Sequence, residues 1–173
     1  DSADTVVVVL LRKSLTEKLS TSLTNADTIK GTLIIDLDGN TYETSAKALF
    51  QFNAKNSTNN PKIELRNGRI NTVRLIAFAN QTTAKCQNYD ILFKNVTLGF
   101  TSGTWNDMIS TNQTAASDGY YAHANLTFED CVFDLRANQT FTSYNLLNLA
   151  NDTNNHAIDV IFRGGEFLLD DYT

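Results

Sequence analysis

The stretch that decides the fold is Ile63-Glu-Leu65-Arg-Asn67-Gly-Arg-Ile70, because its pattern returns after 28 residues as Ile91-Leu-Phe93-Lys-Asn95-Val-Thr-Leu98. The same frame occurs three more times, as Ile35-Asp-Leu37-Asp-Gly39-Asn-Thr-Tyr42, Leu126-Thr-Phe128-Glu-Asp130-Cys-Val-Phe133 and Val160-Ile-Phe162-Arg-Gly164-Gly-Glu-Phe167. An apolar residue lies two positions before and five positions after each of the anchors, which are Leu37, Leu65, Phe93, Phe128 and Phe162. Anchor spacings of 28, 28, 35 and 34 residues are typical of stacked supersecondary repeats.

One position in the repeat is restricted to residues that tolerate a left-handed backbone. The residue two positions after each anchor is Gly39, Asn67, Asn95, Asp130 or Gly164. Gly, Asn and Asp adopt positive φ most readily, so this column predicts a sharp bend. Apolar residues at i and i+2 before the bend predict a strand with one buried face. Each coil also contains a second predicted strand, at Leu49 to Ala54, Leu75 to Ala79, Met108 to Thr111 and Leu146 to Ala150.

The repeated frame and its bend resemble the right-handed parallel β-helix of the pectate-lyase-like superfamily over residues 29–169. The turn Gly39-Asn-Thr-Tyr42 resembles one found near the start of such proteins. The resemblance implies an all-β chain, a right-handed parallel β-helix of about five coils whose equivalent residues stack as ladders. A leucine-rich repeat, with its period of about 20 to 29 residues, and another all-β stack remain alternatives.

The N-terminal segment is expected to close one end of this solenoid. The run from Val6 to Leu11 has the length and composition of a strand. Ser14-Leu-Thr-Glu17 fits a capping box and predicts a short helix that continues to Asn25. We therefore expect residues 1–28 to form a strand and capping helix, and residues 29–173 to form the β-helix of a single domain.

The valine run has a second interpretation, as a strand donated to the open edge of a neighbouring molecule. No closing cap is recognisable after the last predicted strand, Phe167 to Leu169, so either the natural chain continues or another molecule covers that edge. The residues of the candidate assembly strand are Val6, Val7, Val8, Val9, Leu10 and Leu11.

Composition narrows the possible partners. The 173 residues carry a net charge of −5 without a basic run, which argues against a nucleic-acid partner. No apolar run is long enough to predict membrane insertion. Cys86 and Cys131 are too few for a disulfide framework or a thiolate zinc site, and whether they pair stays open. The polar, uncharged turns favour an extracellular or cell-surface location.

The catalytic residues of the resembled enzymes do not carry over. Those enzymes cleave acidic polysaccharides with clustered aspartates and an arginine, or with aspartates and a His-Gly pair. Here Asp130 is the single acidic residue of the bend column, and neither His123 nor His156 precedes a glycine. The sequence therefore predicts no catalytic residues, no metal ligands and no cofactor, and we expect the protein not to be an enzyme.

Two further patterns concern carbohydrate. Four of seven Asn-x-Thr sequons share one predicted corner, which indicates either a stripe of glycans or asparagines that shape the corner. The seven asparagines are Asn56, Asn80, Asn95, Asn112, Asn125, Asn138 and Asn151. Insertions in the later coils also suggest a sugar-binding surface, formed by Trp105, Tyr120 and Tyr121.

We therefore expect a non-enzymatic, extracellular, structural or adhesin-like solenoid module that is glycosylated and assembles through its open ends. The expected partners are copies of itself or the rest of a longer surface polypeptide, together with glycans. The alternative is a β-helix domain that binds or cleaves polysaccharide. Fold analogy does not decide between the two.

Overall fold

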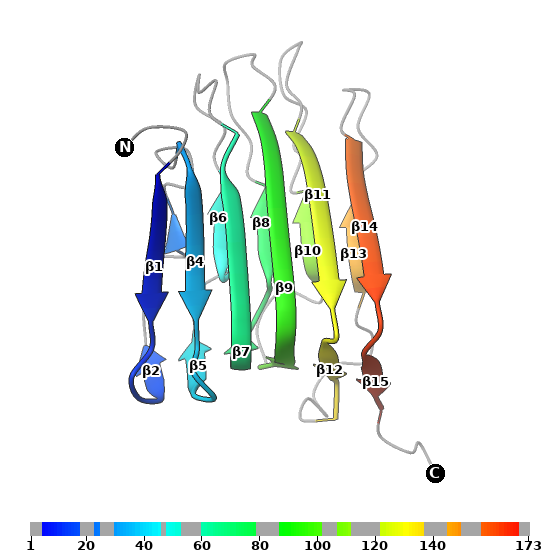
Figure 1. The fold of residues 1–173 in the computed structure, drawn as a ribbon. Coiled ribbons are helices and arrows are strands. Elements are labelled where there is room, and N and C mark those ends of the chain that lie inside the picture. Colours follow the sequence, from blue (N-terminus) through cyan, green and yellow to red (C-terminus); the bar gives the residue numbers. More distant parts are fainter. Residues whose placement is uncertain are drawn as a thin grey trace.

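The structure is a computed structural model that describes residues 5–17, 23–24, 30–45, 48–52, 60–78, 87–101, 107–111, 122–136, 145–149 and 157–169. All regular secondary structure in these residues is β-strand, and every strand pairing is parallel. The chain forms a β-solenoid (Figure 1). The leucine-rich repeat alternative is wrong, since its strands form one row only, whereas strands here form two opposed sheets.

The first wall of the solenoid is a parallel sheet whose strands follow one another in chain order. These strands are β1 (Val6–Leu10), β4 (Thr32–Asp36), β7 (Lys62–Thr72), β9 (Gln87–Phe100), β11 (Ala122–Glu129) and β14 (Ala157–Arg163). After a corner the wall continues in the ends of β7 and β9 and in four short strands, β2 (Leu15–Glu17), β5 (Thr41–Thr44), β12 (Val132–Asp134) and β15 (Glu166–Leu168).

The second wall lies opposite the first and completes each coil. Its strands are β3 (Leu23–Thr24), β6 (Phe50–Phe52), β8 (Ile76–Phe78), β10 (Asp107–Thr111) and β13 (Asn145–Leu149). In Figure 1 the chain descends along the nearer wall, returns along the fainter one behind it and advances to the right, so the winding is right-handed. This is the usual hand of parallel crossovers. The predicted second strands are confirmed to within two residues at their ends.

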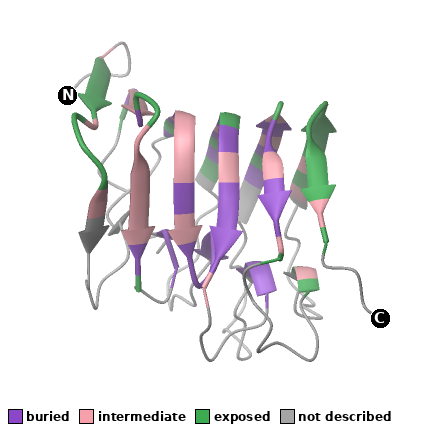
Figure 2. Cartoon of the chain, turned by 90° about the horizontal axis from the view of Figure 1, so that it is seen from below, coloured by how far each residue is buried: buried purple, intermediate pink, exposed green. Residues whose placement is uncertain are grey.

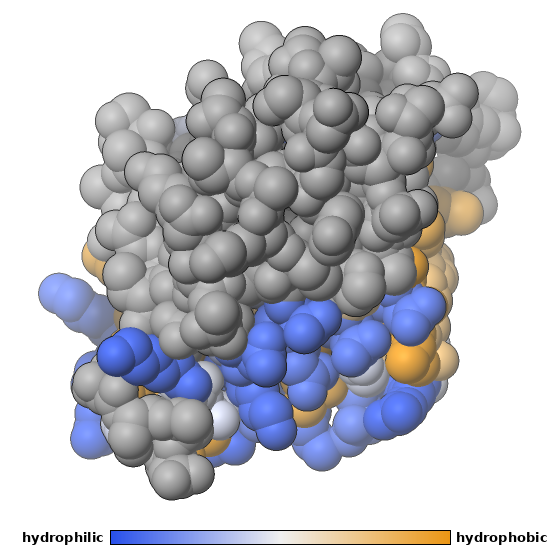
Figure 3. Space-filling view, turned by 90° about the horizontal axis from the view of Figure 1, so that it is seen from above, coloured by the Kyte–Doolittle hydropathy of each residue, from blue (hydrophilic) through white to orange (hydrophobic). Residues whose placement is uncertain are grey.

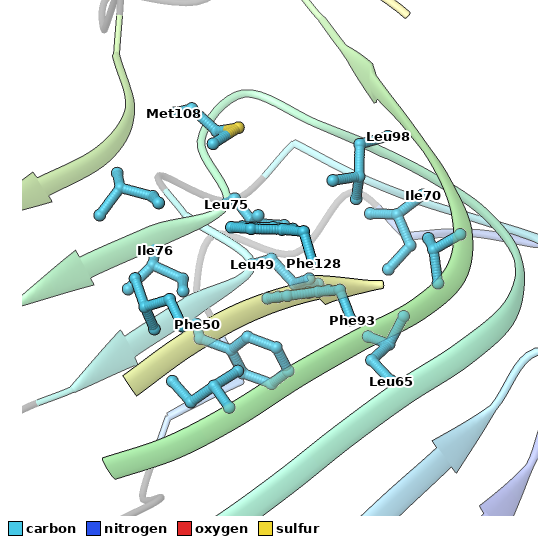
Figure 4. Close-up of a cluster of buried hydrophobic side chains, with 14 of the residues drawn as sticks. Leu49, Phe50, Leu65, Ile70, Leu75, Ile76, Phe93, Leu98, Met108 and Phe128 are labelled. Carbon is cyan, nitrogen blue, oxygen red and sulfur yellow. The ribbon is translucent and has the colours of Figure 1, made fainter. Parts of the chain in front are cut away.

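Apolar ladders fill the space between the walls (Figure 4). Register aligns Leu65, Phe93 and Phe128 on successive rungs, and all three side chains are buried. The rings of Phe93 and Phe128 stack with centroids 5.1 Å apart, and Phe162 continues the stack at 5.4 Å. Burying a side chain of this size contributes about 1.5–3 kcal/mol relative to exposure, so the ladders are the main stabilising feature of the fold.

The predicted bend column is confirmed by the backbone. Asn67, Asn95 and Asp130 have φ values of 59°, 53° and 52°, and Gly39 and Gly164 have 76° and 72°. Register stacks the last four of the five bends on one another, as the repeat predicted. Side chains connect neighbouring bends as well, because Asn95 Nδ2 donates a hydrogen bond to Asn67 Oδ1 at 3.2 Å.

The predicted anchor of the first repeat is wrong by two positions. Ile35, not Leu37, lies opposite Leu65. The reason is a corner with two additional residues between Asp36 and Thr41, after which the registers agree again. Leu37 is nevertheless buried, and it occupies the space beside Gly68, where an added Cβ would lie 2.5 Å from the Leu37 Cβ.

The predicted capping helix is wrong where the structure describes it. Leu15 to Glu17 form strand β2, which pairs with β5. Leu15 lies opposite Tyr42 and so occupies the column that continues through Ile70. The pairing of this residue with a neighbouring rung outweighs the local capping pattern, since helix propensity and capping are weak against tertiary context. The rest of the predicted helix is outside the described residues, apart from Leu23 and Thr24, which form β3.

The N-terminal strand is a rung of the solenoid. β1 pairs in register with β4, just as β4 pairs with β7. The first wall thus begins one rung earlier than expected. The number of coils also differs from the expected five, since the well-buried core fills about three turns. Figure 2 shows buried residues in the middle strands and exposed ones at both ends.

Cys131 is a free thiol buried beneath the corner. Burial raises the pKa of this thiol to about 11, so almost none of it is the reactive thiolate at pH 8. We expect Cys131 to resist a disulfide-exchange reagent in the native protein and to react once urea unfolds the chain. The measurement uses a Cys86→Ser variant, so that Cys131 alone reports; rapid labelling under native conditions would contradict the burial.

Candidate functional site

The outer face of the first wall carries a column of charged residues just before the corner, on β4, β7, β9, β11 and β14. Arg66 Nε lies 2.8 Å from Asp36 Oδ2 on the preceding rung, and its Nη1 lies 2.9 Å from Glu64 Oε1. Lys94 pairs with Glu129 on the following rung. These side chains are partly or largely exposed, so the pairs contribute little to stability. Figure 3 shows hydrophilic residues over much of the described surface.

A second polar group lies beyond the corner and spans three rungs. Register places Asn71, Gly99 and Asp134 side by side on β7, β9 and β12. The Arg69 guanidinium crosses the rung of Gly99, and its Nη1 and Nη2 both donate to Asp134 Oδ2 at 3.1 Å. A Cβ on Gly99 would lie 2.7 Å from Arg69 Nη2, so the absence of a side chain at Gly99 leaves room for the guanidinium.

The same carboxylate has a further cation. Arg136 Nε donates to Asp134 Oδ1 at 3.0 Å, while Asn71 links the group to Glu43 on the preceding rung. The pKa of Asp134 is lowered from 3.8, first by the hydrogen bond from Arg136 and then by that from Arg69. Asp134 therefore stays ionised at neutral pH, and its oxygens accept hydrogen bonds from Arg69 and Arg136. This suits the carboxylate to joining rungs and not to donating a proton.

The Asp134 carboxylate makes the stability of the protein depend on pH under acidic conditions. Because the pKa of Asp134 is lower in the folded than in the unfolded chain, its contribution is present above about pH 3.8 and is lost as pH falls through the folded value. We expect the Asp134→Asn variant to lose less stability than the unchanged protein between neutral pH and about pH 3. Urea unfolding at both pH values measures this. The pKa of Asp36 is also lowered, first by Arg66, so both proteins should lose some stability in the same pH range. An equal loss of stability in the two proteins would contradict the contribution assigned to Asp134.

The two ends of the solenoid expose apolar strands. All five residues of β1 are exposed, from 39% for Leu10 to 58% for Val6 and Val8. At the other end Phe162 is 41% exposed and Phe167 is 48% exposed, although the equivalent Phe128 and Phe133 are buried. Within the described residues, β1 pairs with β4 alone and β14 with β11 alone. In the part of the chain that the structure describes, each end therefore presents a strand edge without a partner strand, which is a template for pairing with another strand.

Some of the predicted site residues lie in the described part of the chain, and others lie outside it. Val6 to Leu10 lie on the exposed edge, whereas Leu11 is half-buried and packs against the core. Asn95 and Asn125 are exposed, one at a bend and one within β11. The remaining predicted residues lie outside the described part of the chain, namely Asn56, Asn80, Asn112, Asn138, Asn151, Trp105, Tyr120 and Tyr121.

Sequence reasoning missed two interactions between rungs. One is the bridge from Arg69 to Asp134, and the other is a buried ion pair between Arg74 Nη2 and Asp107 Oδ2 at 2.7 Å. For the pair of Arg74 and Asp107 a signal was present, because opposite charges occur at equivalent positions of neighbouring coils. Reading that signal requires the correct register at the corners. Arg69 and Asp134 are two positions apart in register, so their pairing has no such signal.

No family model, curated protein or solved structure matches the chain. Among the residues that the structure describes, no group of three or more His, Cys, Asp or Glu side chains could hold a metal ion. The same part of the chain contains no helix with the length and hydrophobicity of a membrane span.

Proposed function

We propose that the chain is a non-enzymatic structural module, adhesin-like and located outside the cell or on its surface, whose solenoid is extended by strands that pair with its open ends. The observation that carries the proposal is the combination of exposed apolar side chains at β1 and β14 with an outer edge on each to which no described strand pairs. Soluble domains usually protect such edges with charge, proline or a covering element. The segment Val6–Leu10 contains neither a charged residue nor a proline, and all five of its residues are exposed.

The side-chain chemistry supports a mechanical role in preference to a catalytic one. Two outer carboxylates join different rungs through arginine: Asp36 pairs with Arg66 on the next rung, and Asp134 pairs with Arg69 two rungs away. Both have lowered pKa values, set chiefly by Arg66 and Arg136 respectively. A rigid column with paired surface charges fits a spacer or scaffold. We extend the proposal to a distant relationship with pectate-lyase-like β-helices, based on the coil pattern and the left-handed bends.

Self-association tests the assembly part of this proposal. We expect the mean molecular mass in multi-angle light scattering to rise as the protein is concentrated from the micromolar to the millimolar range. Val8→Lys should suppress the rise, because a lysine on an exposed edge opposes strand pairing. The matched control is Thr127→Lys, which lies on the same outward column within the solenoid. A monomeric mass at every concentration would exclude assembly through these ends.

The proposed location is tested by the sequons. Protein purified from its native source should carry glycans, and its intact mass should fall on enzymatic deglycosylation. Asn125 is exposed on the outer face of β11, so a glycan there displaces no buried side chain. Asn95 is less suitable, because its Nδ2 already donates to Asn67. An unmodified native protein would count against glycosylation.

A further inference from the structure

The two open ends are matched in register, and this decides how a second molecule fits. Following the pairings from rung to rung places Val6 in the column of Asp159 and Leu10 in the column of Arg163. The whole of β1 therefore has its counterpart within β14. Beyond the corner, the column of Leu15 ends at Phe167. On the second wall, the column of Leu23 ends at Leu147.

The side chains at these two ends are also compatible. A rung of β1 placed against β14 brings Val9 over the exposed ring of Phe162 and Val7 over Val160, which continues the interior ladders. On the outer face Val8 lies beside Ile161, and both are exposed in the single chain. Apolar surface thus meets apolar surface, and the strands stay parallel as in every pairing of the fold.

Charge distinguishes this arrangement from one with two identical ends in contact. The corner that follows β1 carries Arg12 and Lys13, both exposed. The equivalent corner at the other end is followed by Glu166, also exposed, which register brings beside Ser14 of an added copy. Two β1 ends in contact would instead bring both pairs of cations to one junction. Glu166 gives these cations an opposite charge in the head-to-tail contact, although Arg163 lies on the same edge, whereas two β1 ends in contact bring cations together.

We propose that a second copy of this chain stacks head to tail, with β1 of one molecule pairing in parallel with β14 of the next. This inference rests on the proposed function and specifies its partner, polarity and register. Such a contact joins two different surfaces of identical molecules. Repetition of that contact extends into a filament unless the rotation between copies closes a ring.

Cysteine cross-linking tests the register. Val8→Cys and Ile161→Cys are made in separate chains that carry different tags and the Cys86→Ser change, and the two are mixed and mildly oxidised. Within one chain these positions are five rungs apart, about 24 Å at the usual strand spacing. That exceeds the reach of a disulfide, so a bond between them must join two molecules. The expected main product is the heterodimer of the two variants.

The control replaces Ile161→Cys with Thr127→Cys, which lies in the same column one rung inside the end. Little heterodimer is expected, because β14 covers that position's edge. Dimers linked through Val8→Cys in both chains would overturn the head-to-tail inference but leave self-association intact. A monomeric mass without any cross-link would overturn this inference and the assembly proposal together.

A charge exchange provides an independent test. Lys13→Glu in the Val8→Cys chain should lower the yield of heterodimer, and Glu166→Lys in the Ile161→Cys chain should restore it. A yield that falls further in the doubly exchanged pair would contradict the proposed alignment of the corners. Because both side chains are exposed, neither change should alter the folding of the separate chains.

Discussion

Replacing Phe128 by alanine is expected to destabilise the solenoid by about 3–5 kcal/mol, the range for a fully buried phenylalanine. The ring lies between Phe93 and Phe162, at 5.1 Å and 5.4 Å, and also meets Phe133 edge-on. Its removal therefore interrupts a stack and leaves a cavity that the fixed strands cannot close. Urea unfolding should show a lower midpoint with an unchanged slope.

The matched control is Phe162→Ala at the end of the same stack. Phe162 is 41% exposed, so its truncation removes less buried area and opens no enclosed cavity. We expect a clearly smaller loss of stability when it is measured at a concentration too low for copies to stack. Equal losses for the two variants would show that the ladder is not the main stabilising feature. If copies stack as proposed, the cost of Phe162→Ala should increase with protein concentration.

The second large effect is expected at the buried ion pair. The side chains of Arg74 and Asp107 are only 3% and 6% exposed, and the charged groups lie 2.7 Å apart. Arg74→Met leaves the Asp107 carboxylate buried without this cation, which should destabilise the protein by about 3–5 kcal/mol. Thermal or urea unfolding at neutral pH measures the loss.

A double variant distinguishes pairing from packing. Arg74→Met combined with Asp107→Leu removes both charges and keeps apolar volume, so most of the lost stability should return. Arg66→Met is the surface comparison, since that side chain is 35% exposed, and a much smaller effect is expected there. A double variant as unstable as the single one would show that Arg74 acts through other contacts.

Much of the solenoid could be predicted from the sequence, because its strongest constraint is local. Left-handed bends admit few residue types, and an apolar pair before each bend fixes which strand face is buried. This is why the column from Asn67 to Gly164 and its flanking apolar residues were identified correctly. The anchor of the first repeat was misplaced at Leu37 instead of Ile35, because nothing in the local pattern reveals a corner of different length.

The N-terminal region was harder to predict for a related reason. Ser14 and Glu17 match a helix start, whereas the strand partner that decides the outcome, β5, lies about a full coil away. Long-range pairing therefore overrides a short motif. A strand at Val6 to Leu11 was predicted from composition and is confirmed as β1, Val6–Leu10. That β1 and β14 occupy the same columns of the repeat follows only from the rung-by-rung pairing.

The corner from Asp36 to Thr41 shows where such a chain tolerates changes in length. Two extra residues there leave the rungs on either side aligned with β7, and Gly68 on the neighbouring rung makes room for the displaced Leu37. Insertions at corners are therefore separated from the alternation that governs the walls. A coil can therefore be lengthened at this corner while its strands still offer the next coil an unchanged row of pairing positions.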